Sequence, residues 1–269
     1  MSDLARELAA AFECGQTTTP PSSRETGFDL DAAYAIEAEL ARTRRAQGHS
    51  TTGYKVGYAN KAVWRALKLE TLVWAHMYDD TVFGPPAPHS FSLANMCSPK
   101  IEPEIVFKLK AALVPGLTEA ADILRSVEWL ALGFEIIDCP FPDWKFQPVD
   151  FVAAFGLHRA LVVGQPLAVD ETNIATLAEQ LPRFTIRLTR DGELAGEGSG
   201  RNSLRSPALC LGELASAIAK RPGAEPLAAG DLVSSGTLTE SQPIAADQSW
   251  TATMDGLNLP ALTLHTTTP

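Results

Sequence analysis

The chain has 269 residues, of which 45% are hydrophobic and 20% charged, as in ordinary globular proteins with one large domain or a core and a small appendage. Asp and Glu number 32 against 22 Lys and Arg, and the resulting net charge of −10 argues against nucleic acid as a partner. No apolar run approaches the roughly 20 residues of a membrane span, and the N-terminus lacks a signal-peptide layout, so we expect a cytoplasmic protein that contacts no membrane. The four scattered cysteines predict reduced thiols.

Residues 1–50 predict a helical N-terminal cap. A short helix is expected over 2–13, followed by a connector rich in Thr, Pro and Ser. Asp29 is placed to cap a second helix that runs to about Gln47, because apolar residues recur there at helical spacing and a glycine follows. The remaining residues, 51–269, are expected to form the catalytic body.

The body is expected to contain few helices and many strands. Asp191-Gly192 and Asp255-Gly256 predict two hairpin turns in a second half that is mostly antiparallel strand. This order favours an α+β fold built on a rolled, mixed sheet over a doubly wound one. Helices are predicted at 61–68, from Thr118 through Leu130, at 174–181 and at 211–220, and strands at 53–58, 100–110, 132–137, 160–163, 184–189, 193–196, 231–235, 249–254 and 257–264.

Two glutamates, Glu102 and Glu104, lie two residues apart on the strand predicted at 100–110. Side chains alternate across a strand, so both carboxylates lie on one face, and the apolar residues between and beyond them lie on the core face. Two like charges this close repel unless a positive charge lies between them, and hard cations such as Mg²⁺ or Mn²⁺ prefer oxygen ligands. By itself the pattern suits a solvated strand face more often than a metal site.

A third acidic residue, Glu135, stands in an apolar run that should be buried. A buried carboxylate is costly unless it is paired or bound to a metal. The alternative to a metal site is a salt bridge, for instance to Arg159 or Lys145.

Three further features carry polar groups in apolar surroundings. Lys55 lies between glycines in a short strand, where it is either a partly desolvated acid–base group or a surface lysine. Asp79 or Asp80 is placed to orient Lys55 or a water, although a loop role is commoner. The segment 233–239, Val-Ser-Ser-Gly-Thr-Leu-Thr, offers N–H groups and hydroxyls that suit a carboxylate, or is simply a tight turn.

Taken together and in this order, these features resemble the fumarylacetoacetate hydrolase superfamily. Within it, the chain is most similar to the 2-hydroxypenta-2,4-dienoate hydratase (2-keto-4-pentenoate hydratase) and 4-oxalocrotonate decarboxylase group. The likeness runs from about Ala32 to Leu264. It rests on the segments Gly53-Tyr-Lys-Val-Gly, Met77-Tyr-Asp-Asp, Pro99-Lys-Ile-Glu-Pro-Glu-Ile, Phe134-Glu-Ile-Ile, Asp143-Trp-Lys-Phe-Gln-Pro-Val-Asp, 198–207 and Gly230-Asp-Leu-Val-Ser-Ser-Gly-Thr-Leu-Thr.

The resemblance implies a role for each of these residues. It implies a mixed β-roll of the fumarylacetoacetate hydrolase C-terminal type with a helical N-terminal region, assembled as a homo-oligomer. The implied site has Lys55 as the catalytic lysine and Asp79 as the acid–base aspartate. Mg²⁺ or Mn²⁺ would be held by Glu102, Glu104 and Glu135, and the substrate would contact Ser235, Gly236 and Thr237.

The reaction implied first is the addition of water to a 2-hydroxy-2,4-dienoate, or its 2-oxo-enoate form, to give a 4-hydroxy-2-oxo acid. The alternatives are a 4-oxalocrotonate-type decarboxylase, an acylpyruvate hydrolase and, outside the enzymes, a scaffold that binds metal and an oxo acid. The chain departs from the family pattern at Ala154 and Phe155, where an acid and an amide are usual, and at Ser206, where many relatives have histidine. If the first two face the pocket, we expect a more apolar pocket and a bulkier or less charged substrate.

Overall fold

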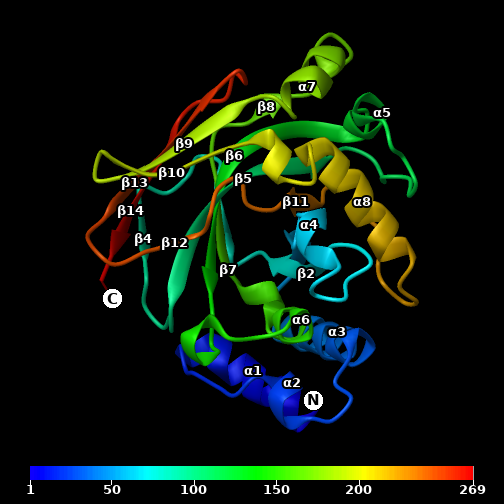
Figure 1. Cartoon of the computed structure of the whole chain (residues 1–269), viewed down its shortest axis with the longest axis vertical. Helices are drawn as coiled ribbons and strands as arrows, with labels where there is room; N and C mark the ends of the chain where they lie inside the picture. Colours follow the sequence, from blue (N-terminus) through cyan, green and yellow to red (C-terminus); the bar gives the residue numbers. More distant parts are fainter. Residues whose placement is uncertain (269) are drawn as a thin grey trace.

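The N-terminal helices of the computed structural model, which describes residues 1–268, lie together at one end of the molecule (Figure 1). They are α1 (Asp3–Cys14), α2 (Pro21–Arg24) and α3 (Leu30–Ala46). Asp29 caps α3 by accepting a hydrogen bond from the Ala32 N–H, as predicted. A small cluster of buried side chains joins α1 and α3 to the body, and it includes Leu40, Tyr78 and Phe155. The predicted boundary at residue 50 falls between α3 and the first strand, and the division into two domains stays a prediction.

The larger of two sheets has nine strands in the order β2-β1-β11-β5-β6-β7-β3, with β12 paired to β5 and β8 paired to β6. β1 pairs with β11 in parallel, and β5 pairs with β6 in antiparallel over almost their whole length. The strands are β1 (Thr51–Gly57), β2 (Val73–Tyr78), β3 (Val82–Phe83), β5 (Pro99–Leu109), β6 (Val127–Asp138), β7 (His158–Val163), β8 (Leu167–Ala168), β11 (Leu232–Ser234) and β12 (Gln242–Pro243).

The second sheet has five strands in the order β10-β9-β13-β14-β4. Its strands are β4 (Ser90–Ser92), β9 (Thr185–Arg190), β10 (Glu193–Ser199), β13 (Ser249–Asp255) and β14 (Leu262–Thr267). The predicted Asp191-Gly192 turn joins β9 to β10 with φ angles of 52° and 86°, as a two-residue hairpin turn requires. β13 and β14 pair in antiparallel, as the hairpin predicted at Asp255-Gly256 requires. The two-residue turn is wrong, because β14 begins only at Leu262 and two buried leucines hold the longer loop against the core.

Short helices connect and cover the sheets. They are α4 (Lys61–Trp64), α5 (Ala120–Leu124), η1 (Pro142–Trp144), α6 (Pro148–Ala153), η2 (Phe155–Leu157), α7 (Ile174–Gln180), η3 (Gly200–Asn202) and α8 (Pro207–Ala219). Figure 1 places α5 and α7 away from the end that holds α1–α3, whereas α8 runs toward α3, where Arg221 just after it donates to Asp31. Among the helices of residues 1–268, none combines the length and the apolar character needed to cross a membrane.

The helix predicted from Thr118 through Leu130 is wrong in its second half. α5 ends at Leu124, and Val127 and Leu130 belong to β6. Apolar residues at this spacing suit a helix or a strand buried on both faces, and the pairing of β6 with β5 decides in favour of the strand. The result is the expected mixed α and β architecture with curled sheets, and β5 and β6 run through its centre.

Candidate metal centre and active-site pocket

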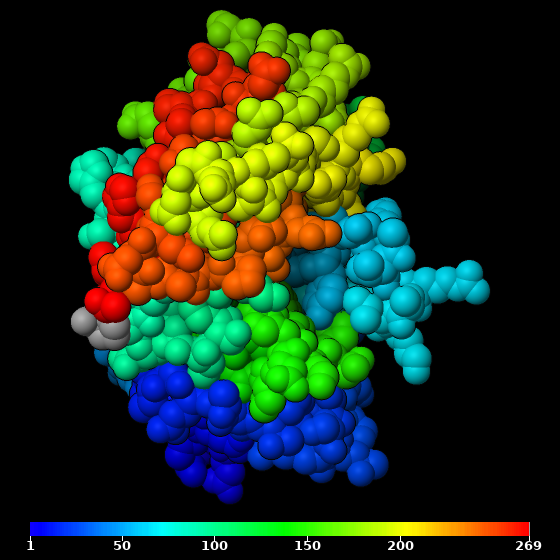
Figure 2. Space-filling model, turned by 60° about the vertical axis from the view of Figure 1, so that its left-hand side comes forward, coloured from blue at the N-terminus to red at the C-terminus, as the bar shows by residue number. Residues whose placement is uncertain are grey.

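A cavity of about 710 Å³ opens beside β5 and β6, and Lys55 and Glu102 form part of its wall. Figure 2 shows the molecule hollowed between the segments near residues 58–63 (cyan), 144–151 (green) and 236–241 (orange). Much of the wall is apolar, with contributions from Trp144, Phe146 and Phe151. The rest of the wall is polar and includes Arg201, Asn202 and Arg205. A cavity of this size, with apolar side chains and convergent polar groups, is typical of a site for a small molecule.

The three predicted glutamates converge at the inner end of this cavity. Glu102 and Glu104 lie on β5, and Glu135 lies on β6 directly opposite Glu102 in the strand register. One carboxylate oxygen from each lies within 4.8 Å of the others. Glu104 and Glu135 are completely buried, whereas Glu102 is half-buried and faces the cavity. The solvated-face alternative for the Glu-x-Glu pattern is therefore wrong.

Each buried glutamate has one oxygen anchored by protein donors and one directed to the cluster. Glu104 Oε2 accepts hydrogen bonds from the Ser234 hydroxyl and from the Gly236 N–H at 2.8 Å. Glu135 Oε1 accepts a hydrogen bond from His158 Nδ1 at 2.8 Å. Glu104 Oε1 is buried and has no hydrogen-bond partner among the described residues, and Glu135 Oε2 is buried with Lys55 Nζ at 3.2 Å as its ion-pair partner. Buried carboxylate oxygens without partners are costly, so this arrangement calls for a cation.

The electrostatics of the three carboxylates support the same conclusion. Burial raises the pKa of Glu102 to about 7, and the neighbouring Glu135 charge adds to the effect. Burial also raises the pKa of Glu104 well above its usual range, with repulsion from Glu135 and Glu102 next in size. Burial acts in the same direction on Glu135, but Lys55 and His158 outweigh it and lower the pKa of that carboxyl. Three acids with a single lysine have surplus negative charge, so the residues present fit a hard divalent cation.

Lys55 is buried at this cluster, so the alternative of a surface lysine is wrong. Its Nζ donates a hydrogen bond to the Gly156 carbonyl at 2.9 Å and lies 3.2 Å from Glu135 Oε2 and 4.6 Å from the Phe151 ring centroid. Gly156 has a φ of 61°, and a Cβ there would lie 2.8 Å from Lys55 Cδ. A glycine is therefore required both by the backbone and by the lysine that packs over it. Arg159 and Lys145, the predicted salt-bridge partners of Glu135, bond elsewhere.

The Ser-Gly-Thr turn after β11 is divided between two environments. Gly236 and Thr237 line the cavity. Ser235 is fully buried behind them, and its N–H donates to the Ile105 carbonyl at 3.1 Å. Gly236 has a φ of 89°, which turns its N–H to Glu104. The predicted donor groups are present, but the Gly236 N–H is used to bind Glu104, which is itself a candidate metal ligand.

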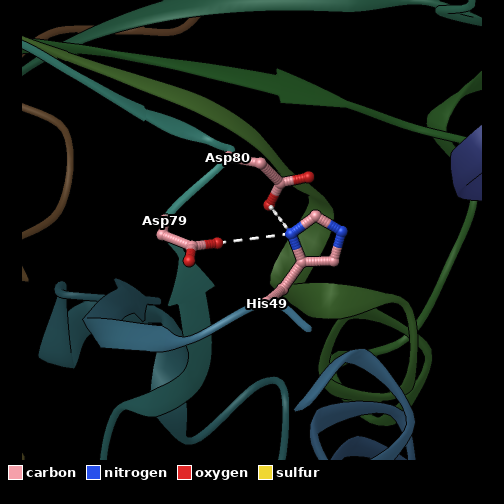
Figure 3. A group of neighbouring side chains, drawn as sticks. All are labelled: His49, Asp79 and Asp80. Atoms are coloured by element: carbon pink, nitrogen blue, oxygen red, sulfur yellow. Dashed lines mark hydrogen bonds and ion pairs between the residues drawn. The ribbon is translucent and has the colours of Figure 1, made fainter. Parts of the chain in front are cut away.

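Asp79 is not brought to Lys55 by this fold, although the resemblance implied a shared site. β1 and β2 are antiparallel, with Lys55 opposite Ala75 and Thr51 opposite Tyr78, so Asp79 lies beyond the far end of this strand pair. Its carboxylate accepts the Ser50 N–H at 3.0 Å. Figure 3 shows it facing His49 Nδ1, at 3.3 Å, with the Asp80 carboxylate on the same nitrogen at 3.5 Å. The Asp79 side chain is 45% exposed and is not part of the cavity wall.

One residue of the cluster, His158, was missed at the level of sequence. Ser234 lies in the segment 233–239, whose hydroxyls were expected to suit a carboxylate, and its hydroxyl anchors Glu104 from the neighbouring strand. His158 opens β7 and binds Glu135 across the sheet. A lone histidine beside an apolar run gives no periodic signal, and only strand pairing places it next to Glu135.

The departures from the family pattern at Ala154 and Phe155 do not face the large cavity. The Phe155 ring lies 4.6 Å from the Phe12 ring and 6.2 Å from the Tyr78 ring, so it packs against α1. The condition on which we expected a more apolar pocket is therefore not met, and Phe155 instead helps to attach the N-terminal helices. Ser206 is buried at the start of α8.

Known proteins similar to this chain share its length and its fold. The 2-hydroxypent-2,4-dienoate hydratase of Pseudomonas putida is 31% identical over 225 residues, which cover 81% of this chain and 95% of that protein. The 2-hydroxyhexa-2,4-dienoate hydratase of Comamonas testosteroni is 29% identical over 255 residues, 94% of this chain and 92% of that protein. No family model matches.

Solved structures show the same architecture. The 4-oxalocrotonate decarboxylase of Pseudomonas putida G7, in complex with magnesium and adipate, superimposes with a TM-score of 0.87 over 98% of this chain and 95% of that chain, at 22% identity. The fumarylpyruvate hydrolase of Pseudomonas aeruginosa, in complex with Mn²⁺ and pyruvate, has a TM-score of 0.58 over 80% of this chain and 89% of that chain, at 17% identity. With its hydratase and decarboxylase relatives, the chain belongs to the 2-hydroxypenta-2,4-dienoate hydratase and 4-oxalocrotonate decarboxylase group.

Proposed function

We propose that the protein is a divalent-metal-dependent hydratase that adds water to a 2-hydroxy-2,4-dienoate and yields a 4-hydroxy-2-oxo acid. The observation that carries this proposal is the convergence of three carboxylates at the wall of the cavity. Glu104 Oε1 is buried without a partner among the described residues, Glu135 Oε2 is paired with Lys55, and Glu102 lines the cavity. Hydratases among the similar proteins support the choice of reaction.

Glu102, Glu104 and Glu135 would hold Mg²⁺ or Mn²⁺, and a cation bound there would polarise the C2 oxygen of the substrate. Three protein carboxylates are fewer ligands than either ion takes, which leaves room for substrate oxygens. Glu102 is the one of the three that lines the cavity, so a cation held by the group would be open to a substrate bound there.

Lys55 is the proposed acid–base residue. Its ammonium group is held at the cluster by the Gly156 carbonyl and Glu135, with the Phe151 ring on another side. From there we propose that Nζ gives a proton to C5 of the dienol while the C2 hydroxyl loses its own, which produces a conjugated 2-oxo-3-enoate. The proton released by the C2 hydroxyl returns to Nζ, and addition of water then places OH on C4 and H on C3. An acid–base group of this kind contributes about 10²- to 10⁴-fold in rate.

The cavity wall supplies the remaining contacts. We propose that Gly236 and Thr237 lie against the substrate with Ser235 behind them, and that the aromatic wall of Trp144, Phe146 and Phe151 limits access of water to the reacting carbons. We further propose that the protein works in the cytoplasm as a homo-oligomer, as the resemblance implies.

Decarboxylation is the second candidate reaction, and the close superposition on a 4-oxalocrotonate decarboxylase favours it over hydrolysis of an acylpyruvate. It needs the same carboxylate cluster and a substrate whose second carboxylate leaves as CO₂. One assay separates the candidates. The protein is incubated with Mg²⁺ and 2-hydroxypenta-2,4-dienoate, the loss of dienol absorbance is followed, and the products are identified.

A 4-hydroxy-2-oxo acid supports the hydratase, and CO₂ released from the dicarboxylic analogue, without turnover of the dienoate, supports the decarboxylase. Metal and oxalate binding without turnover of any dienoate or acylpyruvate would point to a scaffold and contradict both reactions.

A further inference from the structure

We infer that His158 is a positioning residue that sets how Glu135 meets the metal ion. The inference rests on the metal centre of the proposed function and adds to it a residue outside the three carboxylates. His158 is the first residue of β7, the strand next to β6, and its side chain is 1% exposed. It is not among the residues that line the cavity, so we infer that its effect acts through Glu135, to which it is hydrogen-bonded.

Both nitrogens of the His158 ring have partners. Nδ1 donates to Glu135 Oε1 at 2.8 Å, and Nε2 lies 3.0 Å from Thr81 Oγ1. The Thr81 hydroxyl is itself held by the backbone of Tyr78, to whose carbonyl it donates at 3.0 Å. A ring held at two opposite atoms cannot rotate without breaking a hydrogen bond, so the direction of Nδ1–H is fixed by the end of β2.

The fixed direction of Nδ1–H determines which oxygen of Glu135 can bind the cation. With Oε1 held by His158, only Oε2 is directed to the cluster, where it lies 3.2 Å from Lys55 Nζ. Glu104 has the same division, because Ser234 and Gly236 hold its Oε2 and leave Oε1 free. Both buried glutamates are thereby prepared to give the cation one oxygen each, and coordination positions stay available for substrate. Without His158, Glu135 would be free to rotate toward Lys55 or to offer both oxygens.

A second buried histidine–glutamate pair, His76 and Glu37, lies outside the site and provides a control. His76 Nδ1 donates to Glu37 Oε1 at 2.6 Å, and both side chains are buried between β2 and α3. Glu37 has no second carboxylate beside it in the candidate metal groups of the described chain. The same substitution at His76 therefore removes a buried histidine–glutamate hydrogen bond without touching the metal centre.

The test is the affinity for Mn²⁺, measured by titration calorimetry on the full chain, with folding checked by circular dichroism. His158→Leu should weaken Mn²⁺ binding by about 10- to 100-fold, the usual effect of losing a partner of a metal ligand. His158→Asn, whose amide nitrogen comes close to the place of Nδ1, should stay within a few-fold of wild type, and His158→Gln, whose amide reaches toward Nε2, should resemble His158→Leu. His76→Leu should lower the melting temperature and leave the Mn²⁺ affinity unchanged.

Two results would overturn the inference. One is wild-type Mn²⁺ affinity in folded His158→Leu or, if that variant does not fold, in His158→Gln. The other is an equal loss of Mn²⁺ affinity in the His76 variant, which would show that loss of His158 acts by destabilising the fold in general. A wild-type protein that binds no Mn²⁺ is a different failure, because it would remove the metal centre itself and with it the proposed function.

Discussion

Glu102 on β5 and Glu135 on β6 are direct partners in the antiparallel register, so two acidic side chains face each other across a buried strand pair. Opposed like charges destabilise a sheet, and here Glu104 adds a third carboxylate two residues along. Lys55 reaches the group from β1 and compensates part of the charge. The three carboxylates therefore keep a net negative charge, which a bound cation would neutralise.

Glu104→Gln is expected to abolish metal-dependent turnover while leaving the fold intact. The amide fills the same volume, but it removes a negative charge from the centre of the cluster, and repulsion among buried acids is relieved in the metal-free protein. Turnover of the dienoate and Mn²⁺ affinity are measured together. Glu197→Gln, on the exposed face of β10, is the control. Full activity in the Glu104 variant would show that this residue is not a ligand.

Lys55→Met is expected to reduce kcat by about 10²- to 10⁴-fold, the range for loss of an acid–base group. Methionine has the length and apolar body to remain over Gly156 and beside Phe151, so the packing is largely kept. The Mn²⁺ affinity should not fall, since the variant removes a cation that shares Glu135 Oε2 with the metal. Wild-type kcat in this variant would assign the proton transfers to another group.

Metal removal is expected to destabilise the protein more at pH 8 than at pH 5.5. Burial raises the pKa of Glu102 to about 7 and that of Glu104 well above its usual range. A carboxyl whose pKa is raised on folding contributes stability below its unfolded value, and this contribution is lost as pH rises through the folded value. Metal-free protein should therefore lose stability between about pH 4.5 and 7, and Mg²⁺ should restore it.

The melting temperature with EDTA and with Mg²⁺, measured across this range, checks the prediction. Glu135 has a lowered pKa and acts in the opposite direction, but its effect belongs to lower pH and does not reverse the trend. A difference between EDTA and Mg²⁺ that is equal at both pH values would contradict the raised carboxyl pKa values.

Asp79→Asn is expected to keep kcat within about threefold of wild type, because an exposed side chain beyond the far end of the β1–β2 pair has no path to the substrate within one chain. The variant keeps a hydrogen-bond acceptor for the Ser50 N–H, so the turn is preserved. Steady-state kinetics beside Lys55→Met give the comparison. A loss as large as that of the lysine variant would restore the acid–base role that the resemblance implied and place Asp79 at the site by another arrangement.

The local chemistry of the site was predictable from sequence to a considerable extent. Alternation along a strand places Glu102 and Glu104 on one face, and the apolar run around Glu135 predicts its burial. Helix capping at Asp29 and the Asp191-Gly192 turn follow from local backbone preferences, and both predictions are confirmed. These features depend only on neighbours along the chain, so one sequence is enough to find them.

Tertiary structure decided which distant groups meet. Pairing across strands brings His158 to Glu135, although no sequence pattern predicts this contact. Pairing of β11 with β5 brings Ser234, whose segment was expected to bind a carboxylate, to Glu104 in particular. The antiparallel pairing of β1 with β2 separates Lys55 from Asp79, and packing of Phe155 on α1 removes it from the pocket. Residue types and spacing determine the chemistry available to a strand, but register and packing between strands far apart in sequence determine which of those groups can act together.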